Sequence, residues 1–237
     1  MDEVVTALLD EQTGIMPIIL GCSKPNVHYA TFGHSMGAWV AFAMVQRLRR
    51  EHDKLPLPIA MFASCNRAPH LVGFEHDVHS VEMHTLGLAD GGGDAAFWNG
   101  MAERYGDSGM SPGIKKLMLP LLRADFQIIE TWDPSTGEAD RPDSMTCSST
   151  ERRDESNALL NKMPPFGLPI VAIGAMDDRR YTPEQLSAWE LHTTGAFREE
   201  WVSGGHHYFQ HGDPEEVLRI VTDNLEAVVV LEEERAS

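Results

Sequence analysis

The stretch VHYATFGHSMG, residues 27–37, carries a serine where a β-prone run gives way to a helical pattern. Aromatic and β-branched residues before Ser35 favour a strand, and residues 38–50 have apolar side chains at helical spacing. A serine in a sharp strand-to-helix turn has a strained backbone and a hydroxyl pushed out of the sheet, and Gly33 and Gly37 leave room for that turn. The stretch therefore predicts a nucleophile elbow, with a structural Gly-Ser-Gly turn as the alternative.

The size and charge of the chain narrow the classes of protein to which it can belong. Its 237 residues, 42% hydrophobic and 23% charged, suit a single domain over residues 1–237. The 19 basic and 36 acidic residues give a formal net charge of -17, which repels nucleic acid phosphates and anionic membranes. We expect neither nucleic acid nor a membrane as a partner.

Cysteine usage and the first residues indicate a compartment. Cys22, Cys65 and Cys147 are odd in number and lack C-x-x-C spacing, so neither a disulfide framework nor a zinc knuckle is predicted. The chain opens with acidic residues, and the apolar run at 15–20 is short and interrupted by Pro17. No signal peptide or membrane span is predicted, and we expect a cytoplasmic protein.

Strand and helix patterns alternate along the chain. Further strands are predicted over residues 58–64, 168–175 and 197–202. Helices are predicted over residues 2–12, after Pro183 and after Pro214, and an acidic tail is predicted at 232–234. This alternation predicts an α/β fold with a mostly parallel sheet and flanking helices.

A long segment with few strand signals, residues 69–165, interrupts this alternation. Its most periodic part, residues 114–132, predicts a helix, and the polar residues 133–157 predict a flexible loop. Several acidic residues and histidines in the segment have spacings that a metal could use, namely Glu75, His76, His79, Glu82 and His84. They provide no closed set of four ligands, so no metal site is predicted.

A serine hydroxyl needs a base within hydrogen-bond reach and a carboxylate behind that base. Asp177 and Asp178 follow the strand at 168–175, and His206 follows the strand at 197–202. Because the carboxyl ends of parallel strands share one edge of a sheet, we expect these side chains to converge on Ser35. The alternatives are that Asp178 only caps the next helix and that His206 is a surface residue.

Five segments together resemble the type II (external) thioesterases of polyketide and nonribosomal peptide synthesis, an α/β-hydrolase family. They are FGHSMGAWVAFAMVQRLR from residue 32, MFASCNRAPH from 61, LPLLRADFQIIETW from 119, IVAIGAMDDRRYTPEQLSAW from 170 and GGHHYF from 204. In the family pattern the acid lies eight residues before the leucine of P-E-x-L, which implies Asp178 here and leaves Asp177 as the fallback. The family histidine directly follows the glycine pair, which implies His206.

The resemblance also implies the reaction. Ser35 would attack an acyl thioester on the phosphopantetheine arm of an acyl or peptidyl carrier protein, in polyketide, nonribosomal peptide or fatty acid biosynthesis. No cofactor of the protein's own is expected. The backbone N–H of Met36 would stabilise the oxyanion. A helical lid, residues 69–165, would cover the acyl chain, with candidate wall residues Leu86, Leu88, Phe97, Trp98, Leu117 and Leu121.

The chain departs from the family pattern before the elbow. Family members usually begin with several more strands and an F-P-x-A-G-G turn that supplies a second oxyanion donor, and this sequence contains no such motif. We therefore expect an α/β-hydrolase fold whose early strands are missing, with an unpaired edge beside the elbow strand. Losing one oxyanion donor costs a factor of about 10² to 10³ in turnover. The alternatives to a working thioesterase are an incomplete gene product, a weak or inactive carrier-binding remnant, and a general serine carboxylester hydrolase or acyltransferase.

Overall fold

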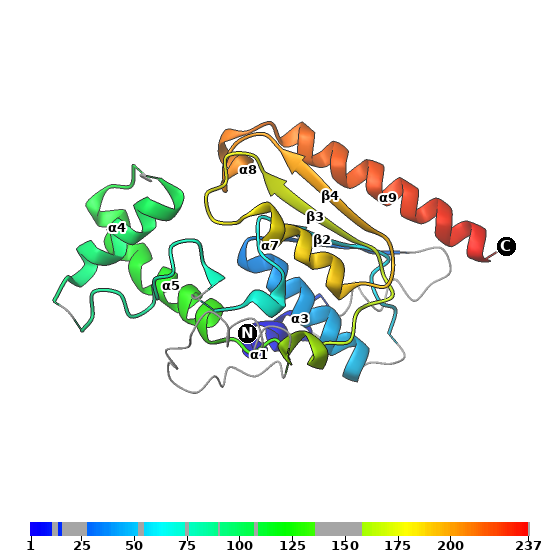
Figure 1. Cartoon of the computed structure of the whole chain (residues 1–237), viewed down its shortest axis with the longest axis horizontal. Helices are drawn as coiled ribbons and strands as arrows, with labels where there is room; N and C mark the ends of the chain where they lie inside the picture. Colours follow the sequence, from blue (N-terminus) through cyan, green and yellow to red (C-terminus); the bar gives the residue numbers. More distant parts are fainter. Residues whose placement is uncertain are drawn as a thin grey trace.

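The computed structural model describes residues 1–10, 14–15, 28–51, 55–73, 76–89, 91–106, 109–135 and 158–236. Figure 1 shows a twisted sheet with helices on both faces and a helical segment that extends beyond one end of the sheet. We call this segment, residues 69–135, the lid segment. Within the described residues, no helix combines the length and apolar character that crossing a membrane requires.

Four parallel strands form the sheet in the order in which they occur in the chain. They are β1 (Thr31–His34), β2 (Met61–Ser64), β3 (Ile170–Ala175) and β4 (Phe197–Val202). The register is regular, with Thr31 opposite Met61, Met61 opposite Ile170, and Ile170 opposite Phe197. The predicted parallel α/β architecture is confirmed, and all carboxyl ends lie on one edge. Among the described strands, β1 pairs only with β2 and is therefore an edge strand.

One face of the sheet packs against helices from two distant parts of the chain. These are α1 (Asp2–Leu8), α3 (Met36–Glu51), α7 (Pro183–Ser187) and the 3-10 helix η3 (Ala188–His192). Alternate strand residues such as Ala63 and Ala172 point to this side, because successive side chains of a strand face opposite ways. The indoles of Trp39 and Trp189 are fully buried here and donate to the carbonyls of the turn after β2. This packing holds that turn beneath the elbow.

The opposite face is covered by the last part of the chain. It comprises α8 (Tyr208–His211) and the long helix α9 (Pro214–Ala236), whose apolar residues pack on Phe62 and Val171. Helix α9 begins at Pro214 as predicted. The predicted acidic tail at 232–234 is wrong, because the helix continues through it to Ala236. Glutamate has a high intrinsic helix propensity, so these residues extend the helix.

The lid segment contains η1 (Pro69–Leu71), α4 (Gly93–Tyr105) and α5 (Pro112–Thr131). Helix α5 matches the helix predicted over 114–132 but begins earlier, because Ser111 caps it and Pro112 occupies its first turn. After α5, Trp132 is buried with its ring 5.5 Å from that of Trp39. Residues 136–157, most of the predicted flexible loop, lie outside the described residues.

Candidate active site

Ser35 sits in the turn between β1 and α3 with a backbone φ of 54°, in the left-handed region that non-glycine residues rarely adopt. Gly33 makes this turn possible, since a Cβ there would lie 2.1 Å from the carbonyl oxygen of Gly37. At Gly37 a Cβ would meet nothing within 4 Å. The expectation that both glycines provide necessary space is therefore correct for Gly33. It is wrong for Gly37, where the position of an added Cβ is unoccupied.

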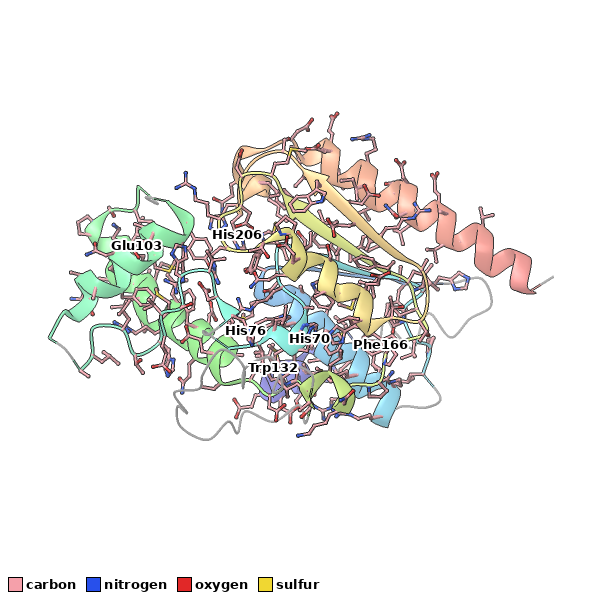
Figure 2. All side chains as sticks on the ribbon, viewed as in Figure 1. His70, His76, Glu103, Trp132, Phe166 and His206 are labelled. Atoms are coloured by element: carbon pink, nitrogen blue, oxygen red, sulfur yellow. The ribbon has the colours of Figure 1, made fainter. Side chains whose placement is uncertain are left out.

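The structure brings Ser35, His206 and Asp178 together in one hydrogen-bonded chain. Ser35 Oγ lies 3.0 Å from His206 Nε2, and His206 Nδ1 lies 2.8 Å from Asp178 Oδ2. The imidazole and the carboxyl are each about 4% exposed. Figure 2 shows His206 on the side of the sheet that faces the lid segment. Three residues far apart in sequence thus meet where β1, β3 and β4 end.

The structure also distinguishes the two candidate aspartates. The side chain of Asp177 is exposed, and its backbone N–H donates a hydrogen bond to the carbonyl of Gly204. Asp178 Oδ1 accepts the backbone N–H of Arg180 at 2.9 Å while Oδ2 contacts the imidazole. Burial alone raises the pKa of Asp178, but the hydrogen bond and charge of His206 and the Arg180 N–H outweigh it and hold the pKa below its ordinary value. The Asp178 carboxyl is therefore ionised at neutral pH.

Met36 is the first residue of α3, so its backbone N–H is among the helix's first donors, which lack an intrahelical acceptor. The positive end of the helix dipole lies at this point. Asn66 also holds the elbow, although the sequence did not single it out. Its Nδ2 donates a hydrogen bond to the backbone carbonyl of Ser35 at 2.8 Å. Asn66 directly follows Cys65, which has a φ of 47°. No spacing in the sequence marks this contact, because it joins the ends of two neighbouring strands.

His34, beside the serine, is a second residue that the sequence did not single out. Its Nδ1 lies 3.0 Å from Ser64 Oγ, which in turn lies 2.7 Å from the hydroxyl of Tyr208. Its ring centroid is 5.1 Å from that of His206. Burial, reinforced by the neighbouring histidines, lowers the pKa of His34 to about 4. His34 is therefore neutral at physiological pH.

An ion cluster joins the lid segment to the sheet beside this site. Asp77 lies among the buried guanidinium groups of Arg67, Arg104 and Arg180. Arg180 also donates to the hydroxyl of Tyr105, the last residue of α4, whose ring centroid is 5.0 Å from that of His206. The cluster thus connects the position of α4 to the imidazole, and the sequence contained no signal of it.

The six predicted wall residues divide into two groups. Phe97 is fully buried with Met83 and Phe126 in a small core of the lid segment itself, and Leu86 and Trp98 pack against it. The other three are exposed, namely Leu88 (66%), Leu117 (70%) and Leu121 (57%). Phe97 therefore stabilises the lid segment internally. The acyl-binding role of these side chains stays a prediction.

The histidines and acids of the lid segment make other contacts. The carboxylate of Glu130 accepts from His84 Nδ1 at 2.7 Å and from the backbone N–H of Met83 at 2.8 Å. Glu75, one of the residues weighed as a ligand, lies outside the described residues. Of the described histidine, cysteine and acidic residues, the groups with metal-compatible spacing surround His206, and none draws on His76, His79, Glu82 or His84.

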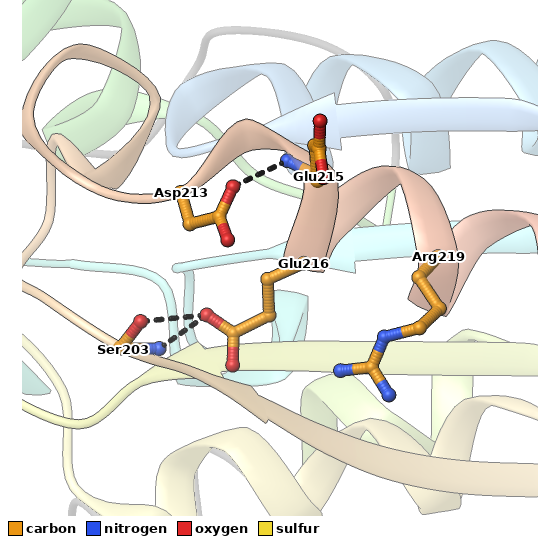
Figure 3. Close-up of a pocket in the computed structure, with 5 residues that line it drawn as sticks. All are labelled: Ser203, Asp213, Glu215, Glu216 and Arg219. Carbon is orange, nitrogen blue, oxygen red and sulfur yellow. Dashed lines mark hydrogen bonds between the residues drawn. The ribbon is translucent and has the colours of Figure 1, made fainter.

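A polar hollow at the start of α9 is shown in Figure 3. Glu216 there accepts hydrogen bonds from the backbone N–H and the hydroxyl of Ser203, and Asp213 accepts from the backbone N–H of Glu215. The two bonds of Glu216 connect the residue after β4 to the first turn of α9. The hollow contains none of the three residues of the hydrogen-bonded chain, so its contacts are structural.

The chain is similar in sequence to known biosynthetic proteins. The linear gramicidin dehydrogenase LgrE of Brevibacillus parabrevis is 28% identical over 211 residues, which cover 86% of this chain and 65% of that protein. The thioesterase PikA5 of Streptomyces venezuelae is 27% identical over 197 residues, 83% of this chain and 56% of PikA5. The chain thus spans less than two-thirds of the length of either relative.

The structure is also similar to that of the RedJ thioesterase from the prodiginine biosynthetic pathway in Streptomyces coelicolor. The TM-score is 0.64 at 28% sequence identity, over 94% of this chain and 69% of RedJ. A family model described as the thioesterase domain matches residues 19–225, a range that runs from before the elbow into α9. Since this match includes every strand of the sheet and the whole hydrogen-bonded chain, the protein belongs to the thioesterase domain family.

Proposed function

We propose that the protein is a serine thioesterase of polyketide, nonribosomal peptide or fatty acid biosynthesis. Its substrate is an acyl group on the phosphopantetheine arm of an acyl or peptidyl carrier protein, and it works in the cytoplasm without a cofactor of its own. The observation that carries the proposal is the unbroken hydrogen-bonded chain from Ser35 Oγ through His206 to Asp178. The membership of a thioesterase family supports the choice of a thioester over other acyl substrates.

In the first half of the reaction, Ser35 Oγ attacks the thioester carbonyl carbon as His206 Nε2 takes the hydroxyl proton. Asp178 holds Nδ1–H and stabilises the imidazolium. The tetrahedral intermediate then collapses, the C–S bond breaks, and the departing thiolate receives the proton from His206. An acyl ester on Ser35 and a free phosphopantetheine thiol result.

In the second half, a water molecule attacks the acyl ester and gives its proton to His206. The C–O bond to Ser35 breaks, the serine recovers the proton, and a carboxylic acid leaves. In both halves the carbonyl oxygen becomes negatively charged. The backbone N–H of Met36, the first residue of α3, stabilises that charge, and the helix dipole adds to the effect.

The nucleophile is tested with acyl-pantetheine and acyl-carrier substrates and with a fluorophosphonate probe. We expect hydrolysis and labelling by the unaltered protein and neither by the Ser35→Ala variant. Equal hydrolysis by both proteins would eliminate Ser35 as the nucleophile. Carrier binding without labelling would instead favour the non-catalytic binder, and a preference for oxygen esters would favour a carboxylester hydrolase.

The acid is tested with a matched pair of adjacent substitutions. Asp178→Asn removes the charge that orients the imidazole, and we expect turnover to fall by a factor of roughly 10³ to 10⁴. Asp177→Asn changes an exposed side chain outside the hydrogen-bonded chain, and we expect turnover to stay within a factor of about two. The opposite ranking of the two variants would assign the role to Asp177.

A further inference from the structure

Three imidazole rings gather beside Ser35, and the hydrolytic reaction uses one of them. His34 comes from the end of β1, and His206 and His207 come from the turn after β4. The ring centroids of His34 and His207 are each 5.1 Å from that of His206. One ring nitrogen from each of the three lies within 4.8 Å of the other two. Three imidazole nitrogens around one point are a zinc-binding set.

The half-buried ring of His34 and the buried ring of His206 are held as metal-ligating histidines are usually held. Such a histidine bonds one ring nitrogen to a carboxylate or another acceptor, which fixes the tautomer and leaves the second nitrogen for the metal. His206 Nδ1 is 2.8 Å from the Asp178 carboxylate, and His34 Nδ1 is 3.0 Å from Ser64 Oγ. Both rings therefore offer Nε2. His34 Nε2 is buried.

The third ring supplies the adjustment that a metal would need. Zn–N bonds of about 2.0–2.1 Å in a tetrahedral site place the nitrogens roughly 3.3–3.4 Å apart. This spacing is shorter than the 4.8 Å within which the three ring nitrogens lie. His207 is exposed and its ring stacks on that of Tyr105 with the centroids 5.3 Å apart, so forming the site takes a rotation of this ring away from Tyr105. The net charge of -17 also attracts cations.

We propose that His34, His206 and His207 form a binding site for Zn²⁺ or a similar divalent transition-metal ion, and that the bound ion inhibits the enzyme. The fourth position of the metal is open to water or to Ser35 Oγ. A lone pair of His206 Nε2 that is bound to a metal cannot accept the serine proton, so Ser35 loses its base. The metal site does not depend on the proposed function, whereas the inhibition rests on the proposed function.

Binding is tested by titrating Co²⁺ into the whole protein and recording its visible absorption. We expect one tetrahedral Co²⁺ per chain, displaced by Zn²⁺. His207→Gln and His34→Gln should each weaken Co²⁺ binding about tenfold or more. His28→Gln, which changes an exposed histidine before β1, should leave it unaltered. Equal affinity in the unaltered protein and His207→Gln would overturn the site. A cobalt–thiolate charge-transfer band would also overturn it, because the ion would then have a cysteine ligand.

Inhibition is tested by fluorophosphonate labelling of Ser35 with and without Zn²⁺. We expect Zn²⁺ to block labelling, EDTA to restore it, and His207→Gln to need at least about ten times more Zn²⁺ for the same block. The block is expressed for each protein relative to its own labelling without Zn²⁺. Unchanged labelling while Zn²⁺ displaces Co²⁺ would refute the inhibition. An absence of labelling without any metal would refute the proposed function, and the Co²⁺ spectrum would still decide the site.

Discussion

Replacing Asp77 with asparagine should destabilise the protein far more than the loss of one carboxylate at the surface would. Asp77 Oδ2 lies 2.8 Å from Arg180 Nη2 and 3.9 Å from Arg67 Nη1, and Oδ1 lies 3.5 Å from Arg104 Nη2. The three guanidinium groups are at most 3% exposed. Asparagine keeps the shape of the side chain but leaves three buried positive charges without the carboxylate that faces them.

The size of the effect follows from the burial of these charges. At 2.8 Å and an effective dielectric constant of 20, the gross attraction of the closest pair is about 6 kcal/mol, most of which offsets desolvation. Arg67 and Arg104 keep backbone carbonyl acceptors in the variant, which limits the loss. Removing one partner of a buried pair costs about 3–5 kcal/mol, and we expect that loss of unfolding free energy, or a fall of roughly 6–20 °C in Tm.

The pH dependence has a defined sign. Burial raises the pKa of Asp77, but Arg180, Arg104 and the backbone N–H of His79 outweigh it, so the pKa lies below the ordinary value of 3.8. A lowered carboxyl pKa gives stability that is present above 3.8 and is lost as the pH falls further. The difference between the unaltered protein and Asp77→Asn should therefore be full at neutral pH and shrink below pH 3.8.

Urea unfolding followed by circular dichroism measures this difference. Asp223→Asn, an exposed change on α9, is the matched control and should alter the unfolding free energy by no more than about 0.5 kcal/mol. An Asp77→Asn variant as stable as this control at pH 7 would refute the reasoning, because the cluster would then contribute nothing to holding the lid segment on the sheet.

Three further experiments test other parts of the structure. His70 Nδ1 and His192 Nε2 lie 2.8 Å apart, and burial lowers the pKa values of the two histidines to about 4 and about 3. The unfolding free energy should therefore fall as the pH drops from 6.5 toward 4, and urea unfolding midpoints should fall less steeply with pH for His192→Gln. Gly33→Ala should prevent folding because its Cβ would clash with the backbone of Gly37, whereas Gly37→Ala should raise the unfolding free energy by up to about 1 kcal/mol. Equal stabilities of the two variants in urea unfolding would contradict the elbow geometry. Asn66→Ala frees the Ser35 carbonyl and should lower kcat roughly tenfold to a hundredfold with KM unchanged; steady-state kinetics with unaltered kcat would exclude a positioning role.

Local patterns were enough to place the elements that carry the chemistry. Strand β4 spans the residues predicted for it, and α9 begins at the predicted proline. Apolar periodicity and proline positions are properties of neighbouring residues, so they can be read without knowing the fold. The meeting of Ser35, Asp178 and His206 was predictable for a related reason: each follows a strand, and parallel strands end on one edge.

The contacts that support these residues depend on which elements pack together. Asn66 reaches Ser35 because β1 and β2 are neighbours, and Asp77 meets Arg180 because the chain between them returns to the same edge of the sheet. The exposure of Leu117 also depends on packing, because periodicity predicts an apolar helix face but not which element covers that face. The sequence by itself determined the alternating strands and helices and the residues at the strand ends, because those follow from local spacing. Only the tertiary structure decided the surroundings of the imidazole, because hydrogen bonds and ion pairs between residues distant in sequence form only once the helices and the lid segment have packed.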